Sequence, residues 1–240
     1  MRKQWIFWGL CVVGLLVLRV GEVPVDLAAD GAAQIPAETS YVALTFDDGP
    51  RQGTTDRLLD GLRERGASAT FFLVGEQAER YPELVKRMKA EGHQVGNHTW
   101  SHVRLEGASA AVIQEEVGKD EELLETLLGG SGYWLRPPYG LITPGTEKLI
   151  QVPMVKWSVD PRDWESKNTE KVVQAILKNV KPNSIILLHD IYDTSVDAAL
   201  KVVDTLEAQG YCFVTVEELL RLNDVRPEAG KLYRTGTGTT

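Results

Sequence analysis

Short hydrophobic runs alternate with amphipathic helical patterns along the chain from residue 41 onward. The runs are rich in β-branched and aromatic residues, which is typical of strands. Seven of them are predicted as strands: Tyr41–Phe46, Ala69–Val74, His93–Gly96, Tyr133–Leu135, Met154–Val159, Ser184–Leu188 and Tyr211–Val214. Strands that alternate with helices along a whole domain indicate a parallel sheet, either open or closed into a barrel.

Four segments between these runs repeat their apolar residues at the spacing of an amphipathic helix. They contain Leu58, Leu59 and Leu62; Ile113, Val117, Leu124 and Leu128; Val172, Val173, Ile176, Leu177 and Val180; and Val196, Ala199, Leu200, Val203 and Leu206. Ser109 and Asn168 precede two of the segments as N-caps, and Gly66, Gly129 and Gly210 follow three of them as stop signals. We therefore predict a helix in each segment.

The N-terminal residues follow a different pattern. Arg2 and Lys3 precede an uncharged run from Trp5 to Leu18. A basic start followed by an apolar run of this length is typical of a secretory signal, and an uncleaved membrane anchor fits it as well. We interpret residues 1–20 as a signal peptide or anchor and residues 21–40 as a linker. Both readings predict an extracytoplasmic protein, either secreted or anchored at the outer face of the cell membrane.

The rest of the chain is interpreted as one domain, residues 41–224, followed by a flexible polar tail, residues 225–240. The 240 residues carry 26 basic and 34 acidic side chains, which gives a net charge of -8. This balance argues against a nucleic-acid-binding protein, because no basic surface is available to neutralise phosphates. Only two cysteines occur, Cys11 and Cys212, so no disulfide framework is expected.

Reactive side chains cluster just after the predicted strands. They are Asp47 and Asp48; His98 and His102; Arg136 and Tyr139; Asp160, Asp163 and Trp164; and His189 and Asp190. The carboxyl ends of the strands form the face on which α/β sheets and barrels bind ligands. We therefore expect these residues to form a single site.

His98 and His102 are candidate metal ligands. They are four residues apart, so on one helical turn both imidazoles would point the same way. A carboxylate from Asp48 would complete a site of two histidines and one carboxylate, with open positions for water and substrate. Such an ion suits hydrolysis, because it acidifies water and polarises a carbonyl. Paired surface histidines without a metal are an equally common alternative.

Asp47 and Asp48 are adjacent carboxylates. Two negative charges this close repel each other, which is expected to raise the pKa of one of the two carboxyl groups. One of them could bind the ion while the other serves as a general base. Neighbouring residues at a strand end point to opposite sides, which would allow this division. The sequence Asp-Gly-Pro at residues 48–50 is also good turn chemistry, so a purely structural turn is the alternative.

Three further residues have both a chemical and a structural interpretation. Arg136 could fix a catalytic carboxylate through two parallel hydrogen bonds, or it could lie on the surface. Asp163 could orient a histidine and raise its pKa, or it could simply be exposed. His189, after the apolar run Ile185–Leu188, could act as a general acid or pack in the core.

Five segments, TFDDGP, HTWSH, RPPYG, DPRDW and LLH, occur in this order along the chain. They resemble the motifs of the polysaccharide deacetylases, which form carbohydrate esterase family 4 and contain the NodB homology domain. The resemblance extends from about Tyr41 to Leu222. It implies a distorted (β/α) barrel with as many parallel strands as the seven runs above. It also implies metal-dependent removal of N-acetyl groups from β-1,4-linked amino sugars.

The resemblance assigns a role to each matching residue. The metal ligands would be Asp48, His98 and His102. The catalytic set would be Asp47 as base, Arg136 to orient it, His189 as general acid and Asp163 to tune that histidine. The backbone N–H of Tyr139 would hold the oxyanion, and Leu187 would line the pocket for the acetyl methyl group. Flat faces for sugar rings could come from Trp164, Trp100 and Tyr192, which could equally serve packing.

The expected activity is therefore that of a hydrolase of linear amides. Export favours an envelope glycan: peptidoglycan N-acetylglucosamine is the first choice, a chitin oligosaccharide the second and acetylxylan the third. The expected cofactor is one divalent ion, zinc by its ligands, with cobalt or nickel as possible substitutes. We expect a monomer. A glycan- or metal-binding module without activity is disfavoured, because binding alone requires neither Asp47 nor His189.

Overall fold

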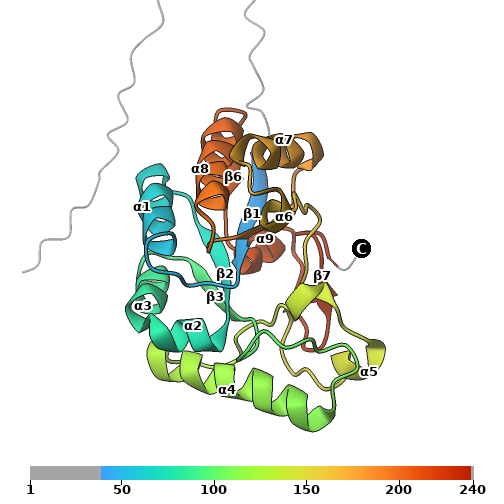
Figure 1. The fold of residues 1–240 in the computed structure, drawn as a ribbon. Coiled ribbons are helices and arrows are strands. Elements are labelled where there is room, and N and C mark those ends of the chain that lie inside the picture. Colours follow the sequence, from blue (N-terminus) through green and yellow to red (C-terminus); the bar gives the residue numbers. More distant parts are fainter. Residues whose placement is uncertain (1–38, 239–240) are drawn as a thin grey trace, which may run out of the picture. The chain divides into compact units, whose positions relative to one another are not determined.

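The computed structural model describes residues 39–238, in which strands and helices alternate (Figure 1). The strands are β1 (Ser40–Asp47), β2 (Ala69–Leu73), β3 (Gln94–Asn97), β4 (Met154–Val155), β5 (Ile185–His189), β6 (Tyr211–Phe213) and β7 (Leu232–Tyr233). The helices are α1 (Thr55–Arg65), α2 (Gly75–Arg80), α3 (Pro82–Ala90), α4 (Ala110–Leu128), α5 (Pro144–Glu147), α6 (Asp163–Ser166), α7 (Thr169–Asn179), α8 (Asp193–Glu207) and α9 (Val216–Leu222). The predicted signal or anchor, and the predicted linker up to residue 38, lie outside the described residues. Within residues 39–238, no helix has the length and apolar character that a membrane crossing requires.

The strands form a distorted barrel. The order β3-β2-β1-β5 is parallel throughout, β6 also pairs with β1, and β7 pairs with β4 in parallel. Single bridges at Leu135 connect β3 to β4, and a bridge between Ser184 and Thr235 connects the β7 segment to the start of β5. The sheet is therefore closed. In Figure 1 the strands lie in the middle of the described residues, with α1 and α3 to their left, α8 beside the upper part of β1, α7 at its upper end and α4 across the bottom.

Two of the predicted strands differ from the structure. Tyr133–Leu135 forms only the isolated bridges of Leu135, because Pro137 and Pro138 follow at once and have no N–H to extend a ladder. Met154–Val159 is reduced to the two residues of β4 and a separate bridge at Val159. The remaining five predicted strands match β1, β2, β3, β5 and β6 to within a few residues.

The four predicted helices correspond to α1, α4, α7 and α8. The end signals of α1, α4 and α7 act as expected, whereas α8 ends at Glu207, before the predicted stop at Gly210. The side chains of Ser109 and Asn168 accept hydrogen bonds from the N–H groups of Val112 and Lys171, which caps α4 and α7. Gly66 ends α1 with a φ of 65°, a left-handed conformation that glycine adopts without a Cβ clash.

The side chains of β1 alternate between two environments. Val42, Leu44 and Phe46 are fully buried in a cluster that also contains residues of α1 and α8. Ala43 belongs to a separate cluster inside the barrel, with residues of β2, β4 and β5. Because successive side chains of a strand point to opposite faces, Thr45 and Asp47 share the interior face with Ala43. The strand therefore delivers a carboxylate to the barrel interior.

The prediction of a flexible tail is wrong for the described part of residues 225–240. β7 lies in this segment, and the Lys156 N–H donates to the carbonyl of Tyr233 at 2.7 Å. Tyr233 is only 2% exposed and packs with Phe72, Val155 and Ile185. The segment covers the edge of β4 that would otherwise remain unpaired. A pair of apolar residues among polar ones is too short a pattern to predict such a strand.

We expect Tyr233→Ala to lower the free energy of unfolding by about 3–5 kcal/mol, the range for removing a buried aromatic side chain. Urea unfolding followed by circular dichroism measures this. Lys231→Ala, an exposed change in the same segment, is the control and should have little effect. Equal stability of both variants would show that the segment does not close the barrel in solution.

Candidate active site

The pairing of β1 with β5 brings two candidate catalytic residues side by side. Asp47, the last residue of β1, is in register with His189, the last residue of β5. Both side chains line a pocket of about 400 Å³. Its walls are Asp47, Asp48, His98, His102, Tyr139, Trp157, Asp160, Trp164, Leu187, His189 and Tyr192. Side chains that follow several different strands are thus gathered in one place.

Asp48, His98 and His102 can hold a metal ion. One ligand atom from each lies within 4.8 Å of the others. Asp48 Oδ1 is 3.6 Å from His98 Nε2 and 3.4 Å from His102 Nε2. That oxygen is buried and accepts no hydrogen bond from residues 39–238. A divalent cation would satisfy it, and two imidazoles with one carboxylate form a suitable donor set, so these residues fit a metal ion.

The two histidines are held in the form that a metal requires. His98 Nδ1 lies 2.6 Å from the carbonyl oxygen of Arg136, which can only accept, so Nδ1 carries the proton. His98 Nε2 therefore keeps its lone pair on the side of Asp48. Burial, followed by repulsion from His98, lowers the pKa of His102. A lowered pKa favours the neutral imidazole, which is the ligating form.

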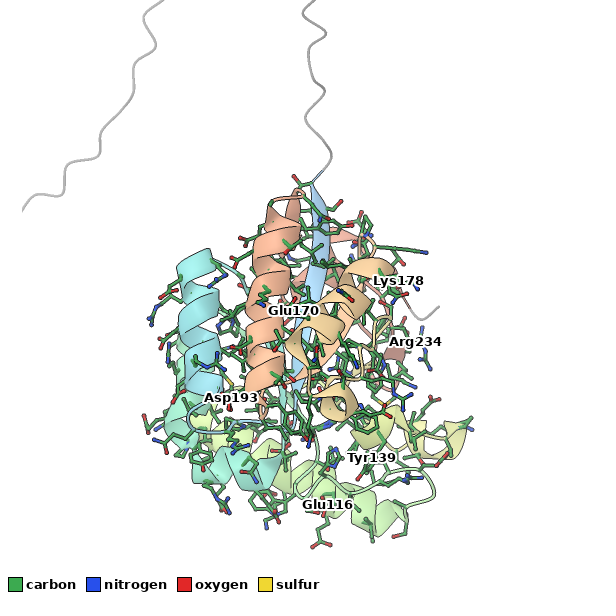
Figure 2. All side chains as sticks on the ribbon, turned by 45° about the horizontal axis from the view of Figure 1, so that its top comes forward. Glu116, Tyr139, Glu170, Lys178, Asp193 and Arg234 are labelled. Carbon is green, nitrogen blue, oxygen red and sulfur yellow. The ribbon has the colours of Figure 1, made fainter. Side chains whose placement is uncertain are left out.

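The histidines do not lie on a helical turn, contrary to the prediction from their spacing. β3 ends at Asn97, and Thr99 and His102 in the following loop have φ angles of 66° and 59°. The imidazole ring centres are nevertheless 4.9 Å apart. Glu116 of α4, labelled in Figure 2, accepts hydrogen bonds from the N–H and hydroxyl of Ser101 at 2.9 and 2.8 Å. The loop thus positions the pair that the spacing had identified.

The expectation that Asp47 and Asp48 point to opposite sides is also wrong. Asp47 Oδ2 and Asp48 Oδ1 each lie 3.6 Å from His98 Nε2. Asp48 has a φ of 72°, which turns it out of the alternation of β1. Both carboxylates therefore face the same imidazole, and a bound cation would reduce their repulsion.

Arg136 is fully buried behind Asp47. Its Nη1 donates to Asp47 Oδ1 at 2.6 Å and to Thr45 Oγ1 at 2.8 Å. Its Nη2 donates to the Lys156 carbonyl at 3.0 Å, and its Nε to the Val155 carbonyl at 3.3 Å. Burial lowers the pKa of Arg136, while the charge of Asp47 raises it. The guanidinium thus donates to four acceptors, one of which is on Asp47. The two parallel hydrogen bonds that we expected to this carboxylate are not formed.

His189 is paired with a buried carboxylate. Its Nδ1 lies 2.9 Å from Asp163 Oδ1, while Asp163 Oδ2 accepts from the His189 N–H at 2.8 Å and the Ser195 hydroxyl at 2.6 Å. Burial by itself lowers the pKa of His189. The hydrogen bond and charge of Asp163, with the charges of Asp47 and Asp48, outweigh it and raise that pKa to about 9. A histidine protonated at neutral pH can donate a proton.

The remaining predicted residues lie around the pocket. Leu187 is two residues before His189 in β5 and shares its face. Trp164 is 44% exposed, and Tyr139, labelled in Figure 2, is 56% exposed with its ring centre 4.7 Å from that of His102. Tyr192 also lines the pocket.

Trp100 is not among the pocket residues, so its suggested contact with a sugar is not supported. It packs against Gly75, where a Cβ would lie 2.6 Å from its ring. The Lys119 ammonium lies 3.5 Å from the centre of the same ring. Trp100 is therefore a packing residue.

Three contributing residues were not predicted: Trp157 in the pocket wall, Thr45 beside Arg136, and Ser195 beside Asp163. Thr45 lies two residues before Asp47, so strand alternation would have placed both on one face. Ser195 lies in α8, and no local sequence pattern connects it to Asp163.

Comparisons with known proteins identify the family of this chain. The family model described as polysaccharide deacetylase matches residues 34–152. A peptidoglycan-N-acetylglucosamine deacetylase of Bacillus cereus is 38% identical over 200 residues, which cover 80% of this chain and 72% of the relative. This chain belongs to the polysaccharide deacetylase family. The motif resemblance noted in the sequence is confirmed.

Two further related proteins extend the comparison. A peptidoglycan-N-acetylmuramic acid deacetylase of Bacillus subtilis is 39% identical over 178 residues, which are 74% of this chain but only 38% of that relative. The chain thus spans well under half the length of this relative. The structure of a family 4 acetyl xylan esterase from Clostridium thermocellum, in complex with a cobalt ion, has a TM-score of 0.77 at 30% identity. The match covers 81% of this chain and 98% of that one.

We expect Arg136→Lys to lower the free energy of unfolding by at least about 1–3 kcal/mol, because a lysine leaves buried acceptors unpaired. Urea unfolding measures the change. Arg63→Lys on the exposed face of α1 is the matched control and should have little effect. If Arg136→Lys were as stable as the control, the guanidinium network would be unimportant for the fold.

Proposed function

We propose that this chain is a metal-dependent hydrolase that removes N-acetyl groups from a glycan outside the cytoplasm. One observation carries the proposal. A carboxylate, Asp47, and a histidine of raised pKa, His189, are in register on neighbouring strands and line the same pocket as the candidate metal ligands. Amide hydrolysis needs a base for the water and an acid for the departing amine. A binding module needs neither.

The proposed metal ligands are Asp48, His98 and His102. When bound there, a divalent ion supplies a Lewis acid that polarises the acetamide carbonyl and makes water more acidic. Zinc is the first choice because histidine and carboxylate are common zinc ligands, and cobalt and nickel are the alternatives. The cobalt ion of the related acetyl xylan esterase is consistent with this set.

Asp47 is the proposed general base. Arg136 engages its Oδ1, which leaves Oδ2, 3.6 Å from His98 Nε2, available for the attacking water. The charge and rigidity of the buried guanidinium keep the carboxylate in one orientation. Asp47 accepts the proton of the water as it attacks the acetamide carbon.

His189 is the proposed general acid. Because Nδ1 is engaged by Asp163, Nε2 is the nitrogen available to donate. Its proton passes to the nitrogen of the departing amine, which would otherwise leave as an unstable amide anion. Asp163 is itself fixed by the hydroxyl of Ser195.

Three residues complete the proposed substrate contacts. The backbone N–H of Tyr139 is a donor for the oxyanion. Leu187 offers an apolar wall for the acetyl methyl group, and Trp164 an exposed ring for a sugar face.

Peptidoglycan N-acetylglucosamine is the proposed substrate. Relatives that are 38% and 39% identical are named for deacetylation of peptidoglycan. The predicted N-terminal signal or anchor would bring the protein to the cell wall, and we propose that it acts there as a monomer. A chitin oligosaccharide is the second candidate. Acetylxylan is the third, because the related acetyl xylan esterase has the same fold.

The direct test is acetate release by the full chain, supplied with zinc or cobalt, from N-acetylated peptidoglycan fragments, chitin oligosaccharides and acetylxylan. Mass spectrometry of the products measures it. We expect the fastest release from peptidoglycan and its loss after chelation. A chain that releases no acetate from any of the three glycans with either metal would contradict the proposed function.

Asp47→Asn and Asp48→Asn should separate the base from the ligand. Asp47→Asn keeps the shape but accepts no proton, so metal content should persist while turnover falls by on the order of 10²–10⁴. Asp48→Asn should weaken metal binding, and excess metal should partly restore turnover. Metal content and acetate release across a metal titration measure both. Loss of the ion from Asp47→Asn and its retention in Asp48→Asn would reverse the two roles.

The pH profile should report the Asp163–His189 pair. Because protonated His189 is the active form, activity should fall as pH rises through the pKa of this group, about 9 in the free protein. A bound cation lowers that value. Asp163→Asn removes the carboxylate that raises the pKa, so the alkaline limb of kcat/KM should move to lower pH. An unchanged limb would mean that another group titrates there.

A further inference from the structure

Asp190 is a buried carboxyl group that the proposed mechanism does not use. It directly follows His189 at the end of β5 and is fully buried. Its Oδ2 accepts a hydrogen bond from the hydroxyl of Thr55, the first residue of α1, while its Oδ1 has no partner within residues 39–238. An isolated buried carboxyl group is unfavourable for stability. We therefore expect Asp190 to make a specific contact with another part of the structure.

That contact is the turn that carries Asp48. A Cβ built on Gly49 would lie 2.3 Å from Asp190 Oδ1 and 2.5 Å from Oδ2. The Asp190 carboxyl group therefore occupies the space that a Cβ of residue 49 would need, and no residue larger than glycine fits without movement. The Gly49 carbonyl is held from the other side by the N–H of Val74 at 3.2 Å. The turn is thus enclosed between β2 and Asp190.

A short chain of hydrogen bonds extends the same contact. Thr55 donates to Asp190 and accepts from the Arg51 N–H at 2.8 Å. The Arg51 guanidinium donates to the carbonyl of Ile191, next to Asp190, at 2.8 Å. Figure 2 shows Asp193, at the start of α8, beside α1, where Arg57 pairs with it at 3.0 Å. The segment after β1 is therefore tied to the segment after β5.

These two segments carry different parts of the proposed site. Asp47 and His189 are register partners at the ends of β1 and β5, so Asp48 and Asp190 are the first residues after the two strands. Asp48, with its φ of 72°, faces the histidines, and Asp190 occupies the space behind its turn. Contacts of this kind orient metal ligands in other proteins.

We propose that Asp190 is a positioning residue, which fixes the Asp48–Gly49 turn against the end of β5 and so sets the metal ligand Asp48 relative to His189. This rests on the proposed function, in which Asp48 binds the ion and His189 donates the proton. Asp190 is not among the residues that line the pocket. Its effect passes through Gly49 and Thr55.

The test measures zinc affinity of the full chain by competition with a chelating indicator, beside thermal unfolding and acetate release. Asp190→Ala should weaken zinc binding by about 10–100-fold, the usual effect of losing an outer contact of a metal ligand. Asp190→Asn keeps the shape and an acceptor oxygen and should bind zinc nearly as the parent does. Thr55→Val should weaken zinc binding, whereas Thr55→Ser, which keeps the hydroxyl, should not.

Two further variants separate positioning from mere stability. Leu62→Ala creates a cavity in the buried face of α1 and lowers the melting temperature, but should leave zinc affinity unchanged. Gly49→Ala should weaken zinc binding, and Gly49→Ala combined with Asp190→Ala should be no weaker than the worse single variant, because both act on one contact.

The outcomes distinguish this proposal from the proposed function. If the parent protein binds zinc and releases acetate but Asp190→Ala binds zinc normally, the positioning role is wrong and the function stands. Strictly additive losses for Gly49→Ala and Asp190→Ala would also overturn the positioning role. A parent protein that binds no zinc and releases no acetate would overturn the proposed function itself.

Discussion

The site is organised around the buried positive charge of Arg136. The guanidinium is fully buried, so every polar group that it contacts must be held in place. It donates to Asp47 and Thr45 on β1 and to two carbonyls at the end of β4. Its own carbonyl accepts from His98 Nδ1. One residue therefore contacts both the proposed base and one proposed metal ligand, and it joins three segments of the barrel.

Carboxylates and histidines are concentrated in the pocket next to Arg136. Asp47 and Asp48 both lie 3.6 Å from His98 Nε2, and Asp163 is buried beside His189. Without a cation, the two adjacent carboxylates repel each other. Arg136 compensates the charge on one side and a divalent ion would do so on the other. The hydrogen bond and charge of Asp163, followed by the charges of Asp47 and Asp48, also raise the pKa of His189.

The sequence predicted the alternation of strands and helices and the gathering of reactive residues after the strands, because both depend on local patterns. It identified His98 and His102 by their spacing but assumed a helix where Thr99 and His102 adopt left-handed loop conformations. It missed β7, Thr45 and Ser195, whose contacts come from distant parts of the chain. The hydrogen bonds of Arg136 were also unpredictable, since its carbonyl acceptors depend on where β4 ends.

The proposed metal ion binds between Asp48, His98 and His102, beside Asp47 and His189. Anomalous X-ray diffraction at the zinc edge, from crystals of the full chain grown with zinc, tests this site directly. We expect one strong peak within coordination distance of Asp48 and of the Nε2 atoms of both histidines, with Asp47 and His189 outside that distance. A strongest peak elsewhere, or coordination by Asp47 in place of Asp48, would contradict it.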